Sequence, residues 1–576
     1  MIRVVASVFV ILATAFAQAE TEKVVKHYQW EPTPPEKEGE ESKQRFPEVK
    51  NLDGFTVPLY KRYDRDQLPV ELLQRRMQTR NISLAGWRGE RVHAQVLAFS
   101  SETMKQLRAK LSEFKSPESV SLPGSIGKCR FVRYVLADGK LTGDILDNAK
   151  EIDAAAGTTR PVWLSVDIPT DALPGIYEAT MEVRAADREP LEFPIRLKVQ
   201  KQKLPPPSEW PFHLDIWQQP WAVARLHQVE PWSEAHWVIM REILTMLGDA
   251  GVKCITTSIN HKPWNQPAYD AFGGMIEWRR HPDGKWSFDY TLFDRYVDLA
   301  MECGIKKQIN CYSMLPWGNL YYYIDVATGD RKQIKVEPGT PEYETFWTPF
   351  LNDFTKHLKV KGWLDKTCIA TDELDLANMV KFIKLLKKAA PQLKIALSAN
   401  TKLETIEADV YDYCFLIKFV EQNDRAWFEK RRKAGRVTTY YVCCHPQRPN
   451  TFTNSPPAES TWLGWYSRAQ ELDGFLRWAF VHWNKEPMIN TDFGHWPTGD
   501  AFLIYPGPRS SVRWELLRDG IEDFEKLRII EPKLSAEQKS QLQAIYDRFH
   551  YSDLESPAVL THTVLKAKSL LERFSE

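Results

Sequence analysis

The stretch FWTPFLNDFTKHLKVKGWLDKTCIATDE, residues 346–373, contains one complete repeating unit of the fold. Its first half places aromatic and aliphatic side chains at helical spacing. Gly362 follows, and a glycine just past a helix turns the chain by adopting a left-handed conformation. The apolar run at 368–370 then predicts a buried strand, which ends at the adjacent acids Asp372 and Glu373. One unit is therefore a helix, a glycine and a strand.

The same order recurs on both sides of this stretch. Apolar residues at helical spacing precede Gly251, Gly304, Gly435 and Gly474, and a strand-like run follows each glycine. Eight strands alternating with helices predict a (β/α)8, TIM-like barrel. An open doubly wound sheet is the competing layout, but no GxGxxG motif follows a strand. The eight candidate strands lie at 212–219, 252–259, 305–314, 365–373, 394–400, 413–419, 437–445 and 475–483.

The rest of the chain contains three other kinds of segment. Between 54 and 203, apolar and polar residues alternate in short runs broken by Pro and Gly, which is typical of a β-sandwich. The run Leu204-Pro205-Pro206-Pro207 marks a stiff linker, so we place the barrel at 208–532. Residues 20–53 are charged and Pro-rich and predict an extended leader. Residues 533–576 predict amphipathic helices, so the fold class is a β-sandwich followed by an α/β barrel and a C-terminal helical segment.

Residues 1–19 indicate a cleavable secretory signal. Arg3 gives a charged start, an apolar run follows from Val4 to Phe16, and Ala17-Gln18-Ala19 supplies the small residues of a cleavage site. No later stretch reaches the roughly 18 uncharged residues that a membrane helix needs. We therefore expect an exported protein, periplasmic or secreted, with no membrane span.

Composition narrows the class of function. The 76 Lys and Arg residues equal the 76 Asp and Glu residues, which leaves no basic excess to displace counterions and disfavours nucleic-acid binding. The 21 Trp, 21 Tyr and 27 Phe residues suggest aromatic surfaces of the kind that bind sugars. Eight cysteines are too few for a disulfide scaffold. The run Cys443-Cys444-His445 has no CxxC spacing and no second ligand pair, so we expect neither a metal nor a cofactor.

Catalytic groups of such a barrel lie at the C-terminal ends of its strands, where the βα loops form the open face. The fourth strand is distinctive because two carboxylates, Asp372 and Glu373, follow each other at its end. The other strand ends carry Asp215, Trp217, Asn260, His261, Asn310, Tyr312, Asn400, Lys418, Glu421, Tyr441, His445, His482, Trp483 and Asn484.

Neighbouring residues of a regular strand point to opposite faces. Asp372 and Glu373 can therefore share one pocket only where the strand ends and the backbone leaves the pleat. Two close carboxylates do not both ionise freely, and one of them keeps a proton while the other is an anion. Glycoside cleavage needs this division of roles. The competing interpretation is that the acids cap the helix that follows them.

A protein nucleophile would require a second carboxylate about 5 to 5.5 Å from the acid. The seventh candidate strand, 437–445, carries no Asp or Glu. This favours a nucleophile supplied by the substrate, namely the 2-acetamido oxygen of an N-acetylhexosamine. Glu421 and Asp492 could still reach the barrel mouth from other loops, so both sources of the nucleophile stay open.

Three stretches resemble glycoside hydrolase family 123, the β-N-acetylgalactosaminidases. The resemblance covers most of residues 54–530. It implies a β-sandwich followed by a (β/α)8 barrel, and exo-acting removal of terminal β-N-acetylgalactosamine (β-GalNAc) from glycosphingolipid-type glycans and oligosaccharides. The stretches are Trp87-Arg88-Gly89-Glu90, Thr371-Asp372-Glu373, and a block from Arg477-Trp478 through Tyr505-Pro506-Gly507 and Ser511-Val512-Arg513-Trp514-Glu515 to Leu517-Arg518-Asp519-Gly520-Ile521-Glu522-Asp523.

The resemblance also implies roles for the acid pair. Glu373 would be the general acid/base, while Asp372 would orient the acetamido group and stabilise an oxazolinium intermediate. Two successive inversions would then retain the anomer, with no metal or organic cofactor. From their positions in the sequence, we further predict sugar contacts for Trp217, Asn310, Tyr312, His445, Trp478, Trp483, Asn484 and Asp492. For the aromatic residues, packing between barrel and helices is the alternative.

The expected partner is a glycan that ends in β-GalNAc. The alternatives are a β-N-acetylglucosaminidase or another exo-glycosidase on the same barrel, and a non-catalytic carbohydrate-binding protein. Outside the site, we expect four charged residues of the C-terminal block to support the last helix through ion pairs rather than to touch substrate. These are Arg513, Glu515, Arg518 and Asp523.

Overall fold

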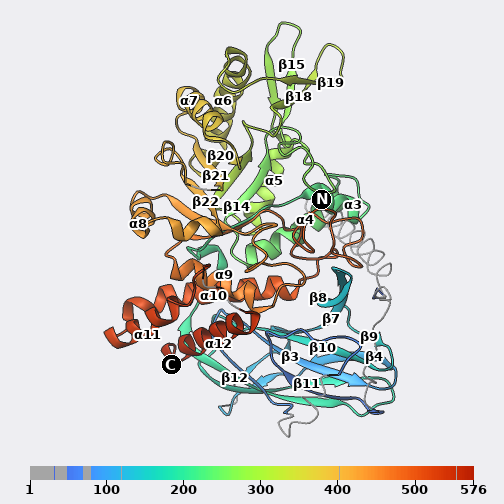
Figure 1. Ribbon diagram of the computed structural model, residues 1–576. Helices are drawn as coiled ribbons and strands as arrows, with labels where there is room; N and C mark the ends of the chain where they lie inside the picture. The colour runs from blue at the N-terminus through green and yellow to red at the C-terminus, as the bar shows by residue number, and fades with distance from the viewer. Residues whose placement is uncertain are drawn as a thin grey trace, which may run out of the picture. The chain divides into compact units, whose positions relative to one another are not determined.

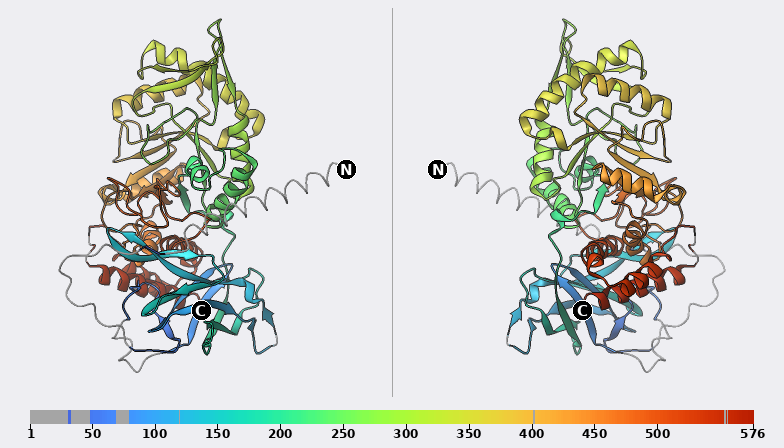
Figure 2. Two further views of the ribbon diagram at one scale, coloured as in Figure 1. Left: turned by 90° about the vertical axis from the view of Figure 1, so that its right-hand side faces the viewer. Right: turned by 90° about the vertical axis from the view of Figure 1, so that its left-hand side faces the viewer.

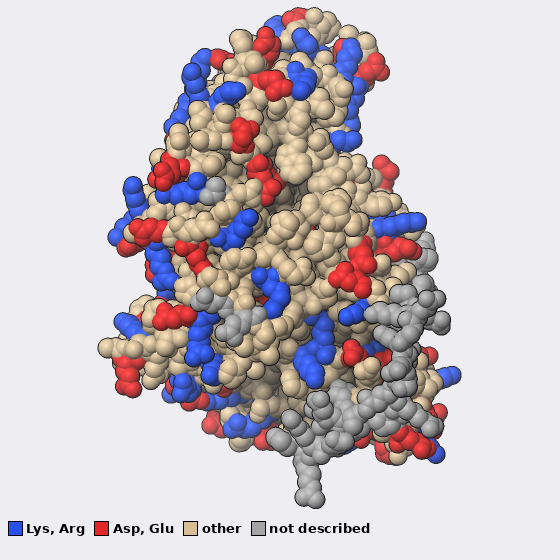
Figure 3. Space-filling view, in the orientation of Figure 1, with Lys and Arg blue, Asp and Glu red and all other residues tan. Residues whose placement is uncertain are grey.

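The computed structural model describes residues 31–32, 48–68, 79–118, 120–400, 402–552, 554 and 556–576. The predicted signal at 1–19 lies outside the described residues, as does most of the 20–53 leader. Within the described part of the chain, none of the helices has both the length and the apolar character needed to cross a membrane. On the face shown in Figure 3, basic and acidic side chains are interspersed.

Two compact units make up the chain. The barrel unit consists of described residues 207–446 and 467–485, and the sandwich unit consists of the described residues up to 206 together with 447–466 and 486–576. The first boundary falls in the predicted Pro-rich linker. Beyond 446 the units divide the chain differently from the predicted ranges, because two C-terminal segments pack with the sandwich strands.

Two sheets form the sandwich and enclose one apolar core (Figure 1). Buried Leu191, Phe193, Ile195 and Leu197 alternate with exposed residues along one strand, which is the predicted period of two. The first sheet has the order β1 (Asp53–Val57), β3 (Arg91–Ser100), β10 (Thr158–Asp167), β7 (Gly127–Ala137) and β8 (Lys140–Asp147). The second has the order β2 (Ile82–Arg88), β12 (Leu191–Lys203), β11 (Gly175–Arg184), β4 (Met104–Leu111) and β9 (Ile152–Ala154), with β5 (Phe114–Lys115) and β6 (Ser121–Leu122) beside β11.

The barrel unit contains all eight predicted parallel strands in the predicted order. From the second strand to the eighth, each strand pairs with the next barrel strand along the chain, and the eighth pairs with the first. A single bridge from Leu214 to Val252 joins the first strand to the second. The result is a nearly closed barrel. The strands are β13 (His213–Ile216), β14 (Cys254–Ser258), β17 (Gln308–Tyr312), β20 (Thr367–Asp372), β21 (Lys394–Ala399), β22 (Asp412–Leu416), β23 (Val437–Tyr441) and β24 (Gly474–Arg477).

Helices connect most of the barrel strands. The described residues between β21 and β22, namely 400 and 402–411, form turns in place of a helix, so the unit departs there from a regular (β/α)8 barrel. The helix α9 (Ala458–Ala469) after β23 crosses the boundary between the units. The helices within the barrel unit are α3 (Pro220–Leu226), α4 (Glu234–Asp249), α5 (Thr291–Glu302), α6 (Pro341–Lys361), α7 (Leu376–Ala389) and α8 (Arg425–Lys433).

Four of the five predicted glycine junctions have the left-handed backbone that turns a helix into a strand. Their φ angles are 80° at Gly251, 100° at Gly304, 70° at Gly362 and 69° at Gly435. The prediction for Gly474 was wrong, because this residue is the first of β24. A Cβ there would lie 2.1 Å from the carbonyl oxygen of His213, so the glycine allows close approach of two strands.

A four-stranded sheet, which the sequence pattern did not predict, is inserted into the loops after β14 and β17. Figure 2 shows it extending away from the barrel strands. Trp278 anchors it on α6, with its ring stacked 4.9 Å from Phe346 and 4.5 Å from Phe350. The order of the strands is β16 (Trp286–Asp289), β15 (Glu277–Arg280), β18 (Leu320–Asp325) and β19 (Arg331–Lys335).

The sandwich unit ends in the helices α10 (Val512–Ile530), α11 (Ala536–Tyr546) and α12 (Pro557–Phe574). The predicted ion-pair network on α10 is confirmed. Arg513 Nε lies 2.8 Å from Asp144 Oδ2 on β8, and Glu515 Oε1 lies 2.9 Å from Arg130 Nη1 on β7. Burial alone would raise the pKa of Glu515, but the neighbouring arginines hold it well below its usual range. The other two predicted members form the pairs Arg518–Glu522 and Asp523–Lys568.

Candidate active site

Asp372 and Glu373 lie at the C-terminal end of β20, the fourth strand of the barrel. Asp372 is the last strand residue and is in register with Ser398 on β21, and Glu373 donates its backbone N–H to the Ser398 carbonyl at 2.8 Å. The φ of Glu373 is 46°, in the left-handed region that residues other than glycine rarely adopt. The backbone therefore leaves the pleat at the acid pair, as the sequence argument required, and such strain is concentrated at functional sites.

Helix capping does not explain the pair. The N-cap of α7 is Asp375, whose carboxylate accepts the backbone N–H of Asn378 at 2.9 Å. Because Asp375 occupies the cap position, Asp372 and Glu373 lie before the first turn of the helix. Their side chains are free for another role.

Glu373 is exposed and accepts a hydrogen bond from a residue at another strand end. The hydroxyl of Tyr441, at the end of β23, donates to Glu373 Oε1 at 2.7 Å. The same hydroxyl lies 3.3 Å from Oδ1 of Asn400, which directly follows β21. Tyr441 is itself buried, and its burial together with the nearby Glu373 charge raises its pKa far above the usual value. It is therefore a permanent donor that fixes the position of the Glu373 carboxylate.

Asp372 is half-buried against a group of rings that we call the aromatic wall: Trp217, Trp264, Phe272 and Tyr312. The Trp264 ring lies 5.0 Å from that of Trp217, 4.5 Å from Tyr312 and 4.7 Å from Phe272. Burial and then the charge of Glu373 raise the pKa of Asp372 well above its usual value, and a hydrogen bond from Trp264 offsets part of this rise. In the site without substrate, burial therefore favours the protonated form of Asp372.

Because its pKa is raised, Asp372 lowers the free energy of unfolding at neutral pH. As pH rises from about 4, the unfolded chain releases the Asp372 proton while the folded chain still holds it, so stability falls until the folded pKa is passed. We expect Asp372→Asn to raise the temperature of thermal unfolding by a few degrees at pH 7 and to leave it unchanged near pH 3.5. Calorimetry of the variant and the wild-type protein at both pH values measures this. A lower unfolding temperature at pH 7 would contradict it.

Three of the predicted sugar-contacting residues lie near the acid pair. Trp217 and Tyr312 belong to the aromatic wall, and the Asp372 charge contributes to the raised pKa of Tyr312, after burial and Asp215. Trp478 is partly buried and packs against the apolar cluster that includes the aromatic wall. Its ring centroid lies 5.2 Å from that of His482. The structure thus gathers these rings from three separate strand ends.

Other predicted residues are engaged elsewhere in the barrel unit. Asn310 is buried and donates to Asp215 Oδ2 at 3.0 Å. Trp483 is also fully buried, and its carbonyl accepts a hydrogen bond from Arg225 at 2.8 Å. The same guanidinium lies 3.3 Å from the Asn484 carbonyl. For these residues a sugar contact stays a prediction.

The last two predicted residues lie in different units. His445 is exposed, and its carbonyl accepts the backbone N–H of Cys443 at 3.0 Å. Asp492 belongs to the sandwich unit, where its carboxylate accepts the backbone N–H of Asp138 at 2.9 Å. Their roles in sugar binding also stay predictions.

Three residues beside the pair were not among the predicted site residues: Tyr441 and Trp264, which hydrogen-bond the acids, and Asn400, which contacts Tyr441. Tyr441 and Asn400 were recognised at strand ends, but nothing in the sequence favoured them over other strand-end residues. Trp264 lies in the loop after β14, and the available signal was a tryptophan close to the strand end at Asn260 and His261.

One group among the described residues brings potential metal ligands together: His213, Cys254 and Asp412. These residues begin β13, β14 and β22, at the opposite ends of the strands from the acid pair. His213 Nε2 lies 3.0 Å from Asp412 Oδ2 and 3.3 Å from Cys254 Sγ, and Gln308 donates to the same Asp412 oxygen at 2.7 Å. These hydrogen bonds link the three residues to one another, so we interpret them as part of a buried hydrogen-bond network.

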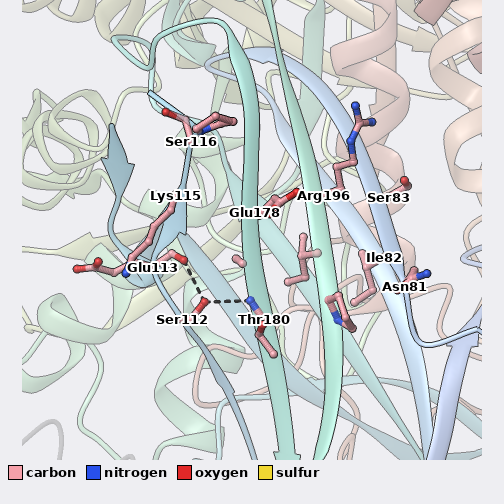
Figure 4. A pocket seen from close by; sticks show the side chains of 14 residues that line it. Asn81, Ile82, Ser83, Ser112, Glu113, Lys115, Ser116, Glu178, Thr180 and Arg196 are labelled. Atoms are coloured by element: carbon pink, nitrogen blue, oxygen red, sulfur yellow. Dashed lines mark hydrogen bonds between the residues drawn. The ribbon is translucent and has the colours of Figure 1, made fainter. Parts of the chain in front are cut away.

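The sandwich unit has a pocket of about 970 Å³ on the seven-stranded sheet (Figure 4). Ser83, Lys115, Glu178 and Arg196 reach it from four strands. No Trp, Tyr, Phe or His is among its lining residues. It lacks the ring faces on which neutral sugars stack, so the candidate active site is at the barrel.

An acid pair beside aromatic rings, at the C-terminal ends of parallel barrel strands, is typical of the active site of a glycoside hydrolase. We therefore place the chain in this class. The family model described as glycoside hydrolase 123, catalytic domain, matches residues 217–530. The model of the glycoside hydrolase 123 N-terminal domain matches residues 60–185. The catalytic-domain match spans more than half of the chain, so the protein belongs to glycoside hydrolase family 123.

A solved structure agrees with this assignment at the level of the fold. A family 123 glycoside hydrolase from Clostridium perfringens, described for glycolipid glycan hydrolysis, is 24% identical over 91% of this chain and 99% of its own, with a TM-score of 0.82. A family 39 glycoside hydrolase from Bacteroides cellulosilyticus WH2 is 11% identical over 76% of this chain and 81% of its own, and its TM-score of 0.34 is too low to support an argument. No curated protein matches the sequence.

Proposed function

We propose that this protein is an exo-acting β-N-acetylgalactosaminidase that retains the anomer through attack by the substrate's own acetamido oxygen. The observation that carries the proposal is the adjacent acid pair, with Glu373 turned out of the strand towards Tyr441 and Asp372 set against Trp264. Family membership and the fold shared with the Clostridium perfringens enzyme support the substrate class, terminal β-GalNAc on glycosphingolipid-type glycans.

The consecutive positions of the acids argue against a protein nucleophile. A general acid protonates the oxygen that leaves C1, while a nucleophile must attack C1 from the opposite face of the sugar. Carboxylates on neighbouring residues reach a bound sugar from the same side. The pair therefore supplies one acid, and its second member acts on the 2-acetamido group.

The reaction then has two steps. The acetamido carbonyl oxygen bonds to C1 as the bond to the leaving oxygen breaks, and Glu373 gives its proton to that oxygen. Asp372 accepts the acetamido N–H and stabilises the positive charge of the oxazolinium ring. In the second step Glu373 takes a proton from water, which bonds to C1 and reopens the ring. The second inversion restores the original anomer.

The proposed mechanism requires the pair to hold one proton when the reaction begins. Without substrate, burial favours its residence on Asp372. An acetamido N–H and a developing positive charge both favour ionised Asp372, so binding shifts the proton towards Glu373. Trp264 and Tyr441 each donate to one member of the pair and keep the two carboxylates in place during this exchange.

Tyr441→Phe should lower kcat by about 10- to 100-fold, because a hydrogen bond to a charged group contributes about 1.5–3 kcal/mol. Tyr413→Phe is the matched control, since the buried Tyr413 hydroxyl accepts a backbone N–H from Leu403 at 2.8 Å, and the described hydrogen bonds to Asp372 and Glu373 come from other residues. Steady-state kinetics on an aryl β-GalNAc glycoside measures both. Equal losses in the two variants would show that Tyr441 does not position Glu373.

Substrate preference is tested with aryl β-glycosides of GalNAc, GlcNAc and galactose. We expect hydrolysis of the GalNAc glycoside with the β-anomer of the sugar as first product, which proton NMR detects before mutarotation. Faster hydrolysis of the GlcNAc glycoside would show that the enzyme is a β-N-acetylglucosaminidase and would contradict the proposed substrate. Efficient hydrolysis of the galactoside would exclude acetamido participation, because galactose has no acetamido group.

A further inference from the structure

His482 is a buried imidazole with no hydrogen-bond partner. It is 1% exposed, and neither Nδ1 nor Nε2 bonds to another group among the described residues. Burial lowers its pKa to about 3, so the ring is neutral at working pH, with one donor and one acceptor. An unpartnered buried polar group destabilises the fold, and natural proteins retain one chiefly where a ligand or ordered water completes it.

A series of ring contacts connects His482 to the acid pair. It follows β24, so it belongs to the C-terminal face of the barrel. Its ring centroid lies 5.2 Å from Trp478 and 5.4 Å from Phe272 of the aromatic wall. Phe272 in turn contacts Trp264, which hydrogen-bonds Asp372. The imidazole is thus two ring contacts from the tryptophan that touches the catalytic carboxylate.

We infer that His482 is a substrate-binding residue that hydrogen-bonds a ring hydroxyl of the terminal sugar between the rings of Trp478 and Phe272. A sugar hydroxyl both donates and accepts, which suits a neutral imidazole. This inference rests on the proposed function for the identity of the sugar. The inference goes beyond the proposed function because it assigns recognition of a sugar hydroxyl to the end of the eighth strand. Recognition of the acetamido group is assigned separately, to the end of the fourth strand.

The barrel offers a matched control for stability. His236 is equally buried, but both of its ring nitrogens are partnered, Nδ1 by the Trp232 backbone N–H at 2.9 Å and Nε2 by the Pro220 carbonyl at 3.0 Å. His236→Phe breaks two hydrogen bonds and should lower the temperature of thermal unfolding. His482→Phe breaks none and should leave that temperature unchanged or higher.

The test measures kcat, KM and thermal unfolding for the wild-type protein, His482→Phe, His482→Gln and His236→Phe, with an aryl β-GalNAc glycoside as substrate. We expect His482→Phe to lower kcat/KM by about 10- to 100-fold, and His482→Gln, which keeps a donor and an acceptor, to lose less. On the deoxy-sugar that lacks the contacted hydroxyl, wild-type protein and His482→Phe should perform alike. Glycosides deoxygenated at C3, C4 and C6 identify that hydroxyl.

Calorimetric binding of free GalNAc to the same variants separates this inference from the proposed function. Weaker binding by His482→Phe supports the inference even for a protein that does not turn the glycoside over, which would refute the proposed function alone. Wild-type kcat/KM and GalNAc affinity in a stable His482→Phe variant would overturn the inference and leave the proposed function intact. A fall in unfolding temperature like that of His236→Phe, with unchanged KM, would assign His482 a structural role and overturn the inference too.

Discussion

Replacement of Glu373 by Gln should reduce kcat/KM by about 10³-fold or more on β-GalNAc glycosides with poor leaving groups, and by far less on the 2,4-dinitrophenyl glycoside. A sugar or methanol leaves C1 only when its oxygen is protonated, whereas dinitrophenolate leaves without a proton. Gln keeps the size of the side chain and its contact with Tyr441 but has no proton to give. The dependence of kcat/KM on the acidity of the leaving group therefore identifies the general acid.

A series of aryl glycosides with phenols of graded acidity measures this dependence. The matched control is Glu421→Gln, since Glu421 is the barrel-unit carboxylate that the sequence left as another possible nucleophile. It should retain near wild-type activity. Equal losses of activity on all leaving groups in Glu373→Gln would remove Glu373 from the acid role, and abolished activity in Glu421→Gln would restore a protein nucleophile.

The second large effect concerns Asp372, whose replacement by Asn should lower kcat/KM by roughly 10²- to 10³-fold on every leaving group. Asp372 is proposed to act on the acetamido group and the positive charge that forms there, which is the same whichever alcohol departs. Asn can still accept the N–H but carries no charge to balance the oxazolinium ring. The loss of kcat/KM in Asp372→Asn should therefore be the same for every aryl glycoside of the series. In Glu373→Gln, by contrast, the loss should depend on the leaving group.

The stability of Asp372→Asn separates a catalytic loss from unfolding. Since the buried carboxyl destabilises the fold at neutral pH, the inactive variant should be the more stable protein, and circular dichroism at pH 7 should show an unchanged fold. If Asp372→Asn instead lost activity only with poor leaving groups, the roles of the two acids would be reversed.

The sequence predicted the barrel strands and the acid pair because both depend on local signals. Helical spacing, a glycine and an apolar run define each unit within a few tens of residues, and Asp372 and Glu373 are consecutive. The turn between β21 and β22, where a regular barrel has a helix, shows where this local pattern failed. The four-stranded insertion was missed for a related reason, because its strands come from two separate loops and pair only in the fold.

The partners of the acids could not be predicted in the same way. Tyr441 and Glu373 are 68 residues apart in sequence, and their contact depends on how the ends of two strands meet across the barrel mouth. Trp264 is likewise in a loop without a periodic pattern. For Gly474 a local pattern led to a wrong prediction. Its place after a helix suggested a turn, but the residue instead allows close packing against β13. Short-range patterns thus located the chemistry, and long-range packing determined its neighbours.

The most direct test is the rate of hydrolysis of aryl 2-deoxy-2-acylamido-β-galactosides in which the acetyl group carries zero, one, two or three fluorine atoms. Fluorine withdraws electrons from the carbonyl oxygen and weakens it as a nucleophile while changing the shape of the sugar little. If that oxygen attacks C1 with Asp372 and Glu373 in support, kcat should fall steeply with each fluorine. A kcat that is the same across the series would show that the acetamido group takes no part in the attack and would contradict the proposed mechanism.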